Sequence, residues 1–162
     1  ELGCGSGCIS VTIAANHPDV RIDAVDVSKE ALSVAEGNVA CHGLQDRITL
    51  RESNWFDSVS GQYHLIISNP PYIESNALES LAPEVKNHDP ILALDGGKDG
   101  LEAYRIIFSQ ARAHLYPQGT LMVEHGAGQE DELQRLMENS GFGQIRAIPD
   151  LSGTNRVLIG CL

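Results

Sequence analysis

Four consecutive residues, Asn69-Pro70-Pro71-Tyr72, carry groups that could hold a planar NH2 group. The Asn69 side chain offers an oxygen acceptor, and Pro70 offers a backbone carbonyl without a competing N–H. The residue before each proline is pushed towards extended geometry, which fixes the direction of these carbonyls. Tyr72 adds a flat ring against which a planar group could pack, and the face of that ring attracts positive charge. The motif therefore favours binding of an amide or amino nitrogen.

The chemistry of such a nitrogen explains why these residue types are needed. An amide nitrogen is a poor nucleophile because its lone pair is conjugated with the carbonyl, and no base at neutral pH is strong enough to deprotonate it. Two acceptors that orient the NH2 group can instead point its lone pair at an electrophilic methyl group. The structural alternative is a proline-rich turn in which Tyr72 only packs, because short motifs also occur by chance.

A glycine-rich loop, Gly3-Cys4-Gly5-Ser6-Gly7, precedes a predicted helix, and Asp26 ends the next predicted strand. Glycine permits a tight turn and close approach of a ligand to the backbone. An acid at the end of that strand can accept hydrogen bonds from the ribose hydroxyls of an adenosine ligand. The dinucleotide fingerprint would need a further glycine at Cys8, which disfavours NAD without excluding it. The structural alternative is a surface aspartate beside a flexible turn.

The elements that must position these residues alternate between strand and helix. This order predicts a doubly wound, Rossmann-like α/β fold, and two consecutive strands at the end predict an antiparallel hairpin. Only Glu1 and Leu2 precede Gly3, so most of the first strand is missing. The long segment at 70–98 is expected to form a substrate-facing lid. The other predicted strands are 21–27, 47–52, 64–68, 120–124, 144–148 and 156–161, and the predicted helices are 7–16, 29–42, 99–115 and 130–139.

Composition narrows the classes of function. The 162 residues fit one domain, and the net charge of -11 argues against a duplex-DNA enzyme, because phosphate contacts require a basic surface. The four cysteines and six histidines show no metal-binding spacing, so we expect no metal site and free thiols in a reducing cytoplasm. No apolar run is long enough to span a membrane. The chain begins at Glu1, and we expect it to be a fragment of a longer protein.

Several stretches together resemble one known family, the HemK/PrmC glutamine methyltransferases that modify peptide-chain release factors. NPPY alone is shared with adenine-amino methyltransferases, whereas the stretch after it and the C-terminal tail are more specific. The resemblance covers nearly the whole chain. Its stretches are ELGCGSG (1–7), the strand ending in Asp26, SNWF (53–56), SNPPYI (68–73), HDPILALDGGKDGLEAYR (88–105), LMVEHGAGQ (121–129) and DLSGTNRVLIG (150–160).

The resemblance implies a seven-stranded methyltransferase sheet and an upstream helical domain that this chain lacks. It implies that S-adenosylmethionine is bound by the glycine loop, by Asp26 at the ribose, and by the SNWF stretch with Asn54 and Trp55. It implies that Asn69, which also borders the cofactor, and Pro70 hold the target amide, and that Pro71 and Tyr72 complete this substrate site. The chain has Asn54 where the family usually has aspartate near the adenine, and His88-Asp89-Pro90 where it has an FEP-like triplet.

These expectations combine into one hypothesis for the chain. It is expected to transfer a methyl group from S-adenosylmethionine to a glutamine side-chain amide, in the Gly-Gly-Gln loop of peptide-chain release factors, in the cytoplasm. The alternatives within the methyltransferases are a ribosomal-protein glutamine and a nucleobase amino group. An alternative of another class is a non-catalytic adenosine-binding module.

Overall fold

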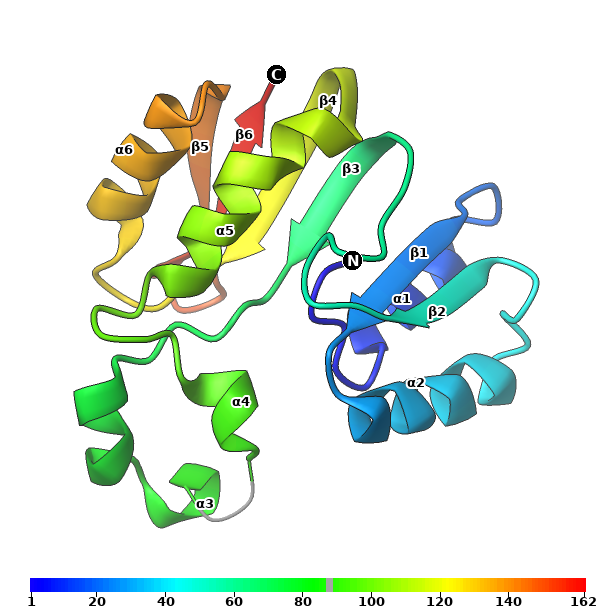
Figure 1. Cartoon of the computed structure of the whole chain (residues 1–162), viewed down its shortest axis with the longest axis horizontal. Helices are drawn as coiled ribbons and strands as arrows, with labels where there is room; N and C mark the ends of the chain where they lie inside the picture. Colours follow the sequence, from blue (N-terminus) through cyan, green and yellow to red (C-terminus); the bar gives the residue numbers. More distant parts are fainter. Residues whose placement is uncertain (87–88) are drawn as a thin grey trace. The chain divides into compact units, whose positions relative to one another are not determined.

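The computed structural model describes residues 1–86 and 89–162, which form two compact units (Figure 1). The first unit is Glu1–Gly61 and the second is Gln62–Leu162. His88, at which the sequence departs from the family triplet, lies outside the described residues. No helix in the described part of the chain has the length and apolar character to cross a membrane.

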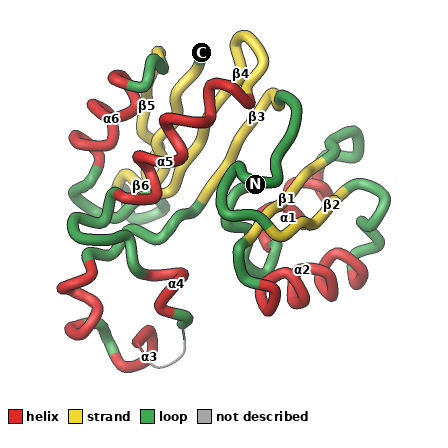
Figure 2. The backbone as a smooth tube through the Cα atoms, viewed as in Figure 1, coloured by secondary structure: helices red, strands yellow, loops and turns green. Residues whose placement is uncertain are grey.

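The first unit is built on two parallel strands, β1 (Ile22–Asp26) and β2 (Ile48–Glu52), in which Ile22 lies opposite Ile48. Two helices, α1 (Cys8–Asn16) and α2 (Lys29–Cys41), complete it (Figure 2). Their apolar faces bury a core that includes Cys4, Val11, Ala14, Ala24, Leu32, Val39, Leu44 and Ile48.

In the first unit, the start of α2 and the pairing before the glycine loop agree with the sequence. Helix α2 begins where the sequence predicts, because the Ser28 hydroxyl accepts a hydrogen bond from the Ala31 amide at 3.1 Å. Before the glycine loop, Leu2 forms an isolated parallel bridge with Val25. The pairing expected for a first strand is therefore present at Leu2, beside β1.

The second unit contains a four-stranded sheet in the order β3-β4-β6-β5. Strands β3 and β4 are parallel, and β6 pairs antiparallel with both β4 and β5, as the two consecutive C-terminal strands predict. Helix α6 packs on β5 and β6 and also contacts α5. The strands are β3 (Tyr63–Ser68), β4 (Leu115–Glu124), β5 (Gly143–Pro149) and β6 (Asn155–Cys161); the helices are α5 (Glu102–Ala111), the 3-10 helix η2 (Arg112–His114) and α6 (Glu130–Asn139).

Two predicted boundaries in this unit were wrong. Strand β4 starts at Leu115 rather than at residue 120, because Tyr63 pairs with Leu115 while Leu65 pairs with Thr120. The intervening residues bulge out of the ladder, and Gln118 has a φ of 66° there, so the predicted turn lies inside the strand as a bulge. Helix α5 covers only Glu102–Ala111, although its predicted apolar face, including Tyr104 and Phe108, is buried.

The segment between β3 and α5 is not plain loop in its described part. It carries the 3-10 helix η1 (Ser75–Ser80) and two single-turn helices, α3 (Pro83–Lys86) and α4 (Ile91–Leu94). None of these three helices buries a residue, and Ile91 is 69% exposed. The two ends of the segment are joined at an isolated parallel bridge between Ile73 and Asp95.

Candidate functional site

The glycine loop has a backbone that only glycine adopts readily. Gly3, Gly5 and Gly7 have φ values of 64°, 53° and 74°, all in the left-handed region. A Cβ atom on Gly7 would lie 3.1 Å from the Ala35 Cβ atom, so this glycine also allows α1 to approach α2. A Cβ atom on Gly5 would meet no atom within 4 Å. Gly5 therefore borders open space, as a loop that lies against a ligand requires.

Asp26 ties the loop to the end of β1. Its Oδ2 atom accepts a hydrogen bond from the Gly5 amide at 2.8 Å, and its Oδ1 atom accepts one from the Ser28 amide at 2.9 Å. A carboxylate can accept about four hydrogen bonds. Because the side chain is only partly buried, acceptor capacity remains for the hydroxyl groups of a ligand.

The SNWF stretch lies beside the glycine loop, at the end of β2. Trp55 is a non-glycine residue with a positive φ of 49°, and its ring carbon Cζ3 lies 3.7 Å from where a Gly3 Cβ atom would be. The Ser53 hydroxyl donates to the Trp55 carbonyl at 3.0 Å and holds this turn. Asn54 is exposed, and its carbonyl accepts a hydrogen bond from the Asp57 amide at 3.1 Å. The first unit thus brings Gly3, Gly5, Asp26 and Trp55 into one region.

Two further residues of this region were not predicted as site residues. The partly buried Glu1 carboxylate accepts hydrogen bonds from the Ser10 amide at 3.0 Å and from the Ser10 hydroxyl, and burial raises the pKa of Glu1. Burial, with the Glu1 and Asp26 charges, raises the pKa of the Cys4 thiol to about 12. Cys4 therefore stays protonated and packs as an apolar residue.

The Asn69–Tyr72 motif follows β3 directly in the second unit, as predicted. Ser68 and Pro70 are buried, Pro71 and Tyr72 are half-buried, and Asn69 is exposed. The exposed Asn69 is anchored on both sides in the chain by buried residues, so its carboxamide can meet a partner from solvent without the backbone moving.

Three glycines surround Tyr72 closely. A Cβ atom on Gly96 would lie 2.8 Å from the Tyr72 Cα atom, and one on Gly100 would collide with the Tyr72 carbonyl oxygen. A Cβ atom on Gly126 would lie 3.1 Å from the ring carbon Cδ2 of Tyr72. Real Cβ atoms do not approach so closely without displacing a neighbour. Two glycines of the DGGKDG stretch, Gly96 and Gly100, therefore let it pack against Tyr72, whereas a Cβ atom on Gly97 would collide with the Glu102 side chain.

His125, at the end of β4, is fully buried. Its Nδ1 atom lies 2.9 Å from the Gly126 carbonyl, and its Nε2 atom has no hydrogen-bond partner among the described residues.

An open cavity of about 500 Å³ lies beside the turn that leads into α5, lined by Ser75, Asn76, Asp95, Gly97, Lys98 and Glu102. No group of three or more possible metal ligands occurs among residues 1–86 and 89–162.

The fold of the chain is that of Rossmann-like methyltransferases. The structure resembles that of a methyltransferase from Pyrococcus furiosus with a TM-score of 0.73 and 18% identity, over 99% of this chain and 73% of that one. The family model of the methyltransferase small domain matches residues 1–86, which include the glycine loop, Asp26 and the NPPY motif. The chain belongs to this methyltransferase family.

Closer relatives have more specific names. The release factor glutamine methyltransferase of Cereibacter sphaeroides is 45% identical over 158 residues, which cover 98% of this chain and 57% of that protein. The protein of the same name from Agrobacterium fabrum is 40% identical over 98% of this chain and 55% of its own length. The chain therefore spans a little over half the length of these curated relatives.

Proposed function

We propose that this chain catalyses transfer of a methyl group from S-adenosylmethionine to the side-chain amide nitrogen of a glutamine in a peptide-chain release factor. The observation that carries the proposal is the Asn69–Tyr72 motif, in which an exposed carboxamide follows a buried strand end and adjoins a tightly packed tyrosine. The names of the relatives, which are release factor glutamine methyltransferases, indicate the substrate.

In this proposal the first unit holds the cofactor. The open space at Gly5 accommodates its methionine part, the free acceptor capacity of Asp26 binds the ribose hydroxyls, and Trp55 and Asn54 border the adenine. The left-handed glycines fit this role because a Cβ atom on Gly5 would enter the space that the ligand needs. The cofactor supplies an electrophilic methyl group on a sulfonium.

The second unit holds the amide. The Asn69 side-chain oxygen and the Pro70 carbonyl accept the two amide hydrogens, which leaves the nitrogen lone pair free to attack the methyl carbon. The C–N bond forms as the S–CH3 bond breaks, and the nitrogen loses one proton to solvent. Preorganised acceptors of this kind act where positive charge develops on the nitrogen in the transition state. Tyr72 packs against the planar amide and leaves room only for a side chain with small neighbours, such as one flanked by glycines.

A protein substrate fits the charge of the chain better than a nucleic acid does. The net charge of -11 opposes the approach of a phosphate backbone. We also propose a cytoplasmic location, because Cys8 and Cys41 are exposed thiols that would persist in a reducing compartment.

Single-turnover methylation of a release factor tests this function, with the full-length protein and mass-spectrometric location of the methyl group. The control substrate is a release factor in which the glutamine of the Gly-Gly-Gln loop is replaced by alanine. We expect methylation of the natural factor alone, on that glutamine. Equal methylation of both factors, or methylation only of a ribosomal protein or a nucleobase, would show that the assignment is wrong.

A further inference from the structure

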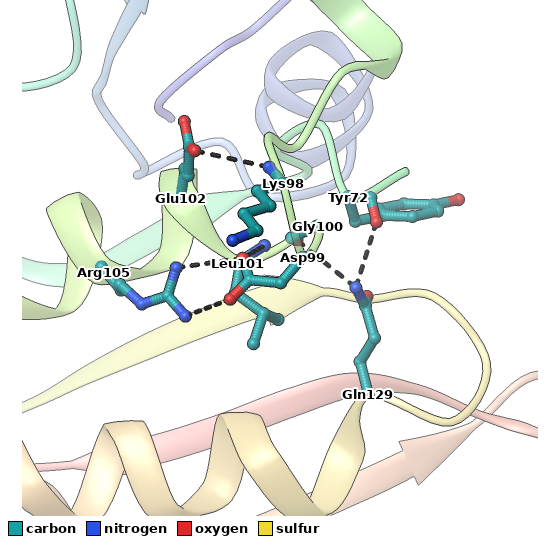
Figure 3. A network of polar contacts seen from close by, with 8 residues as sticks. All are labelled: Tyr72, Lys98, Asp99, Gly100, Leu101, Glu102, Arg105 and Gln129. Carbon is teal, nitrogen blue, oxygen red and sulfur yellow. Dashed lines mark hydrogen bonds and ion pairs between the residues drawn. The ribbon is translucent and has the colours of Figure 1, made fainter. Parts of the chain in front are cut away.

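The Gln129 carboxamide joins three separate backbone segments of the second unit, and Figure 3 shows its contacts with two of them, at Tyr72 and Gly100. Its Nε2 atom donates to the Tyr72 carbonyl at 3.0 Å and to the Gly100 carbonyl at 3.3 Å. Its Oε1 atom accepts from the Gly126 amide at 2.9 Å. A carboxamide has two N–H donors, and here its nitrogen donates to carbonyls near the two ends of the segment between β3 and α5.

The position of Gln129 in the chain indicates that this side chain is not serving its helix. Gln129 is the N-cap residue of α6, where serine, threonine, aspartate and asparagine are favoured because their side chains bond to the first free amides. Gln129 makes no such cap hydrogen bond. The first turn of α6 has Glu130, Asp131 and Glu132 instead, whose charges favour a helix N-terminus.

Gln129 constrains Tyr72 from two directions. It binds the Tyr72 carbonyl directly, and it binds the amide of Gly126, against which the Tyr72 ring packs. The Gly100 side of the network has its own support, because Asp99 binds the Arg105 guanidinium through both carboxylate oxygens, at 3.0 and 2.5 Å (Figure 3). Asp99 also accepts from the Leu101 amide at 3.2 Å. Tyr72 therefore lies in a hydrogen-bonded frame in which Gln129 is the shared contact.

We propose that Gln129 is a positioning residue for methyl transfer, which fixes the direction of Tyr72 and hence of the amide that packs on it. This inference rests on the proposed function of the Asn69–Tyr72 motif. A reacting group displaced by about 1 Å can lose roughly 100-fold in rate. Gln129 acts through Tyr72 and does not itself touch the reacting atoms.

The variant Gln129→Met tests the proposal, because methionine keeps the length of the side chain but has no N–H donor. The control is Gln134→Met in α6, where the exposed Gln134 amide donates to Glu138 at 3.0 Å. In the full-length protein, at a temperature where circular dichroism shows all variants folded, we expect kcat on a release factor to fall about 10- to 100-fold for Gln129→Met. Affinity for S-adenosylhomocysteine should not change, and Gln134→Met should match the wild type.

A double-mutant cycle separates positioning from a general structural role. If Gln129 acts through Tyr72, adding Gln129→Met to Tyr72→Ala should lower kcat much less than Gln129→Met does alone. Additive losses, or a wild-type kcat for Gln129→Met, would overturn the inference while leaving the proposed function intact.

Hydrogen exchange gives a readout that does not need activity. The Ile73 and Ser75 amides donate to Leu94 and Gly97 at 3.0 and 2.9 Å beside Tyr72. We expect faster exchange of these amides in Gln129→Met and no change in Gln134→Met. Unchanged exchange in Gln129→Met would overturn the inference about Gln129, whatever the activity of the protein. A wild-type protein that methylates no release factor would instead contradict the proposed function.

Discussion

The Asp26 carboxylate and the Gly5 amide are joined by a hydrogen bond of 2.8 Å, which ties the end of β1 to the middle of the glycine loop. The acid thus orders the loop before any ligand binds. A ligand that hydrogen-bonds Asp26 meets a loop already in its left-handed conformation, and less conformational entropy is lost on binding.

Replacing Asp26 by alanine should weaken cofactor binding. Hydrogen bonds to a charged group contribute on the order of 1.5 to 3 kcal/mol, which corresponds to a loss of roughly 10- to 150-fold in affinity. Isothermal titration with S-adenosylhomocysteine measures the effect, with Asp19→Ala, at an exposed position of the same unit, as the control. Unchanged affinity in Asp26→Ala would remove this residue from the site.

A methyl group on Gly5 should weaken ligand binding as well as lower stability. Gly5 and Gly43 both have a positive φ, of 53° and 65°, and a Cβ atom on either would meet no protein atom within 4 Å. Gly5→Ala and Gly43→Ala should therefore each lower the free energy of unfolding by a similar 1 to 2 kcal/mol or so. Only Gly5→Ala should weaken S-adenosylhomocysteine binding. Equal affinities in calorimetry would mean that the ligand does not lie against Gly5.

Asn69→Ala should separate chemistry from cofactor binding. Loss of a preorganised polar group that acts in the transition state costs about 100- to 1,000-fold in rate. Single-turnover methylation should fall by this factor, far more than cofactor affinity falls, and Asn139→Ala, at the end of α6, should behave as the wild type.

Asn69→Asp is a sharper version of the same test. It keeps an acceptor of similar size but adds a negative charge, which in the proposed function would stabilise the charged sulfonium ground state more than a transition state in which that charge disperses. The rate should fall here too. A wild-type rate in either Asn69 variant would defeat the assignment of this residue.

The cysteines should react in a fixed order. Cys8 and Cys41 are exposed, whereas Cys4 is buried and its pKa is raised to about 12. Iodoacetamide at pH 8 should therefore alkylate Cys8 and Cys41 in the native protein and reach Cys4 only in denaturant, as peptide mass mapping would show. Rapid native alkylation of Cys4 would contradict the buried position.

The same pKa shift predicts the effect of alkaline pH on stability. The pKa of Cys4 is higher in the folded state than in the unfolded state. The contribution of the protonated thiol to the free energy of unfolding is therefore complete below about pH 9 and is lost as pH rises towards about 12. Cys4→Ser, whose hydroxyl does not titrate in this range, should show a flatter decline in the melting temperature between these pH values. An identical decline in both proteins would assign the alkaline loss to other groups.

Local sequence signals by themselves determined most of the long helices and strands of this protein and the residues of its candidate site. The glycines at positions 3, 5 and 7 permit the left-handed backbone that the loop adopts, and Ser28 caps a helix; each effect acts within a few residues. The strand-helix alternation predicted the α/β class, and the uninterrupted C-terminal strands predicted their antiparallel pairing.

Only the tertiary structure decided the features that depend on contacts between distant residues. The bulge in β4 follows from its register with β3, and the packing of Trp55 on Gly3 depends on the pairing of β1 with β2. The role of Gln129 could not be predicted, because the carbonyls that it binds belong to residues 57 and 29 positions away in the chain. Propensity and periodicity describe neighbours along the chain, whereas a side-chain hydrogen bond between segments exists only after folding has brought them together.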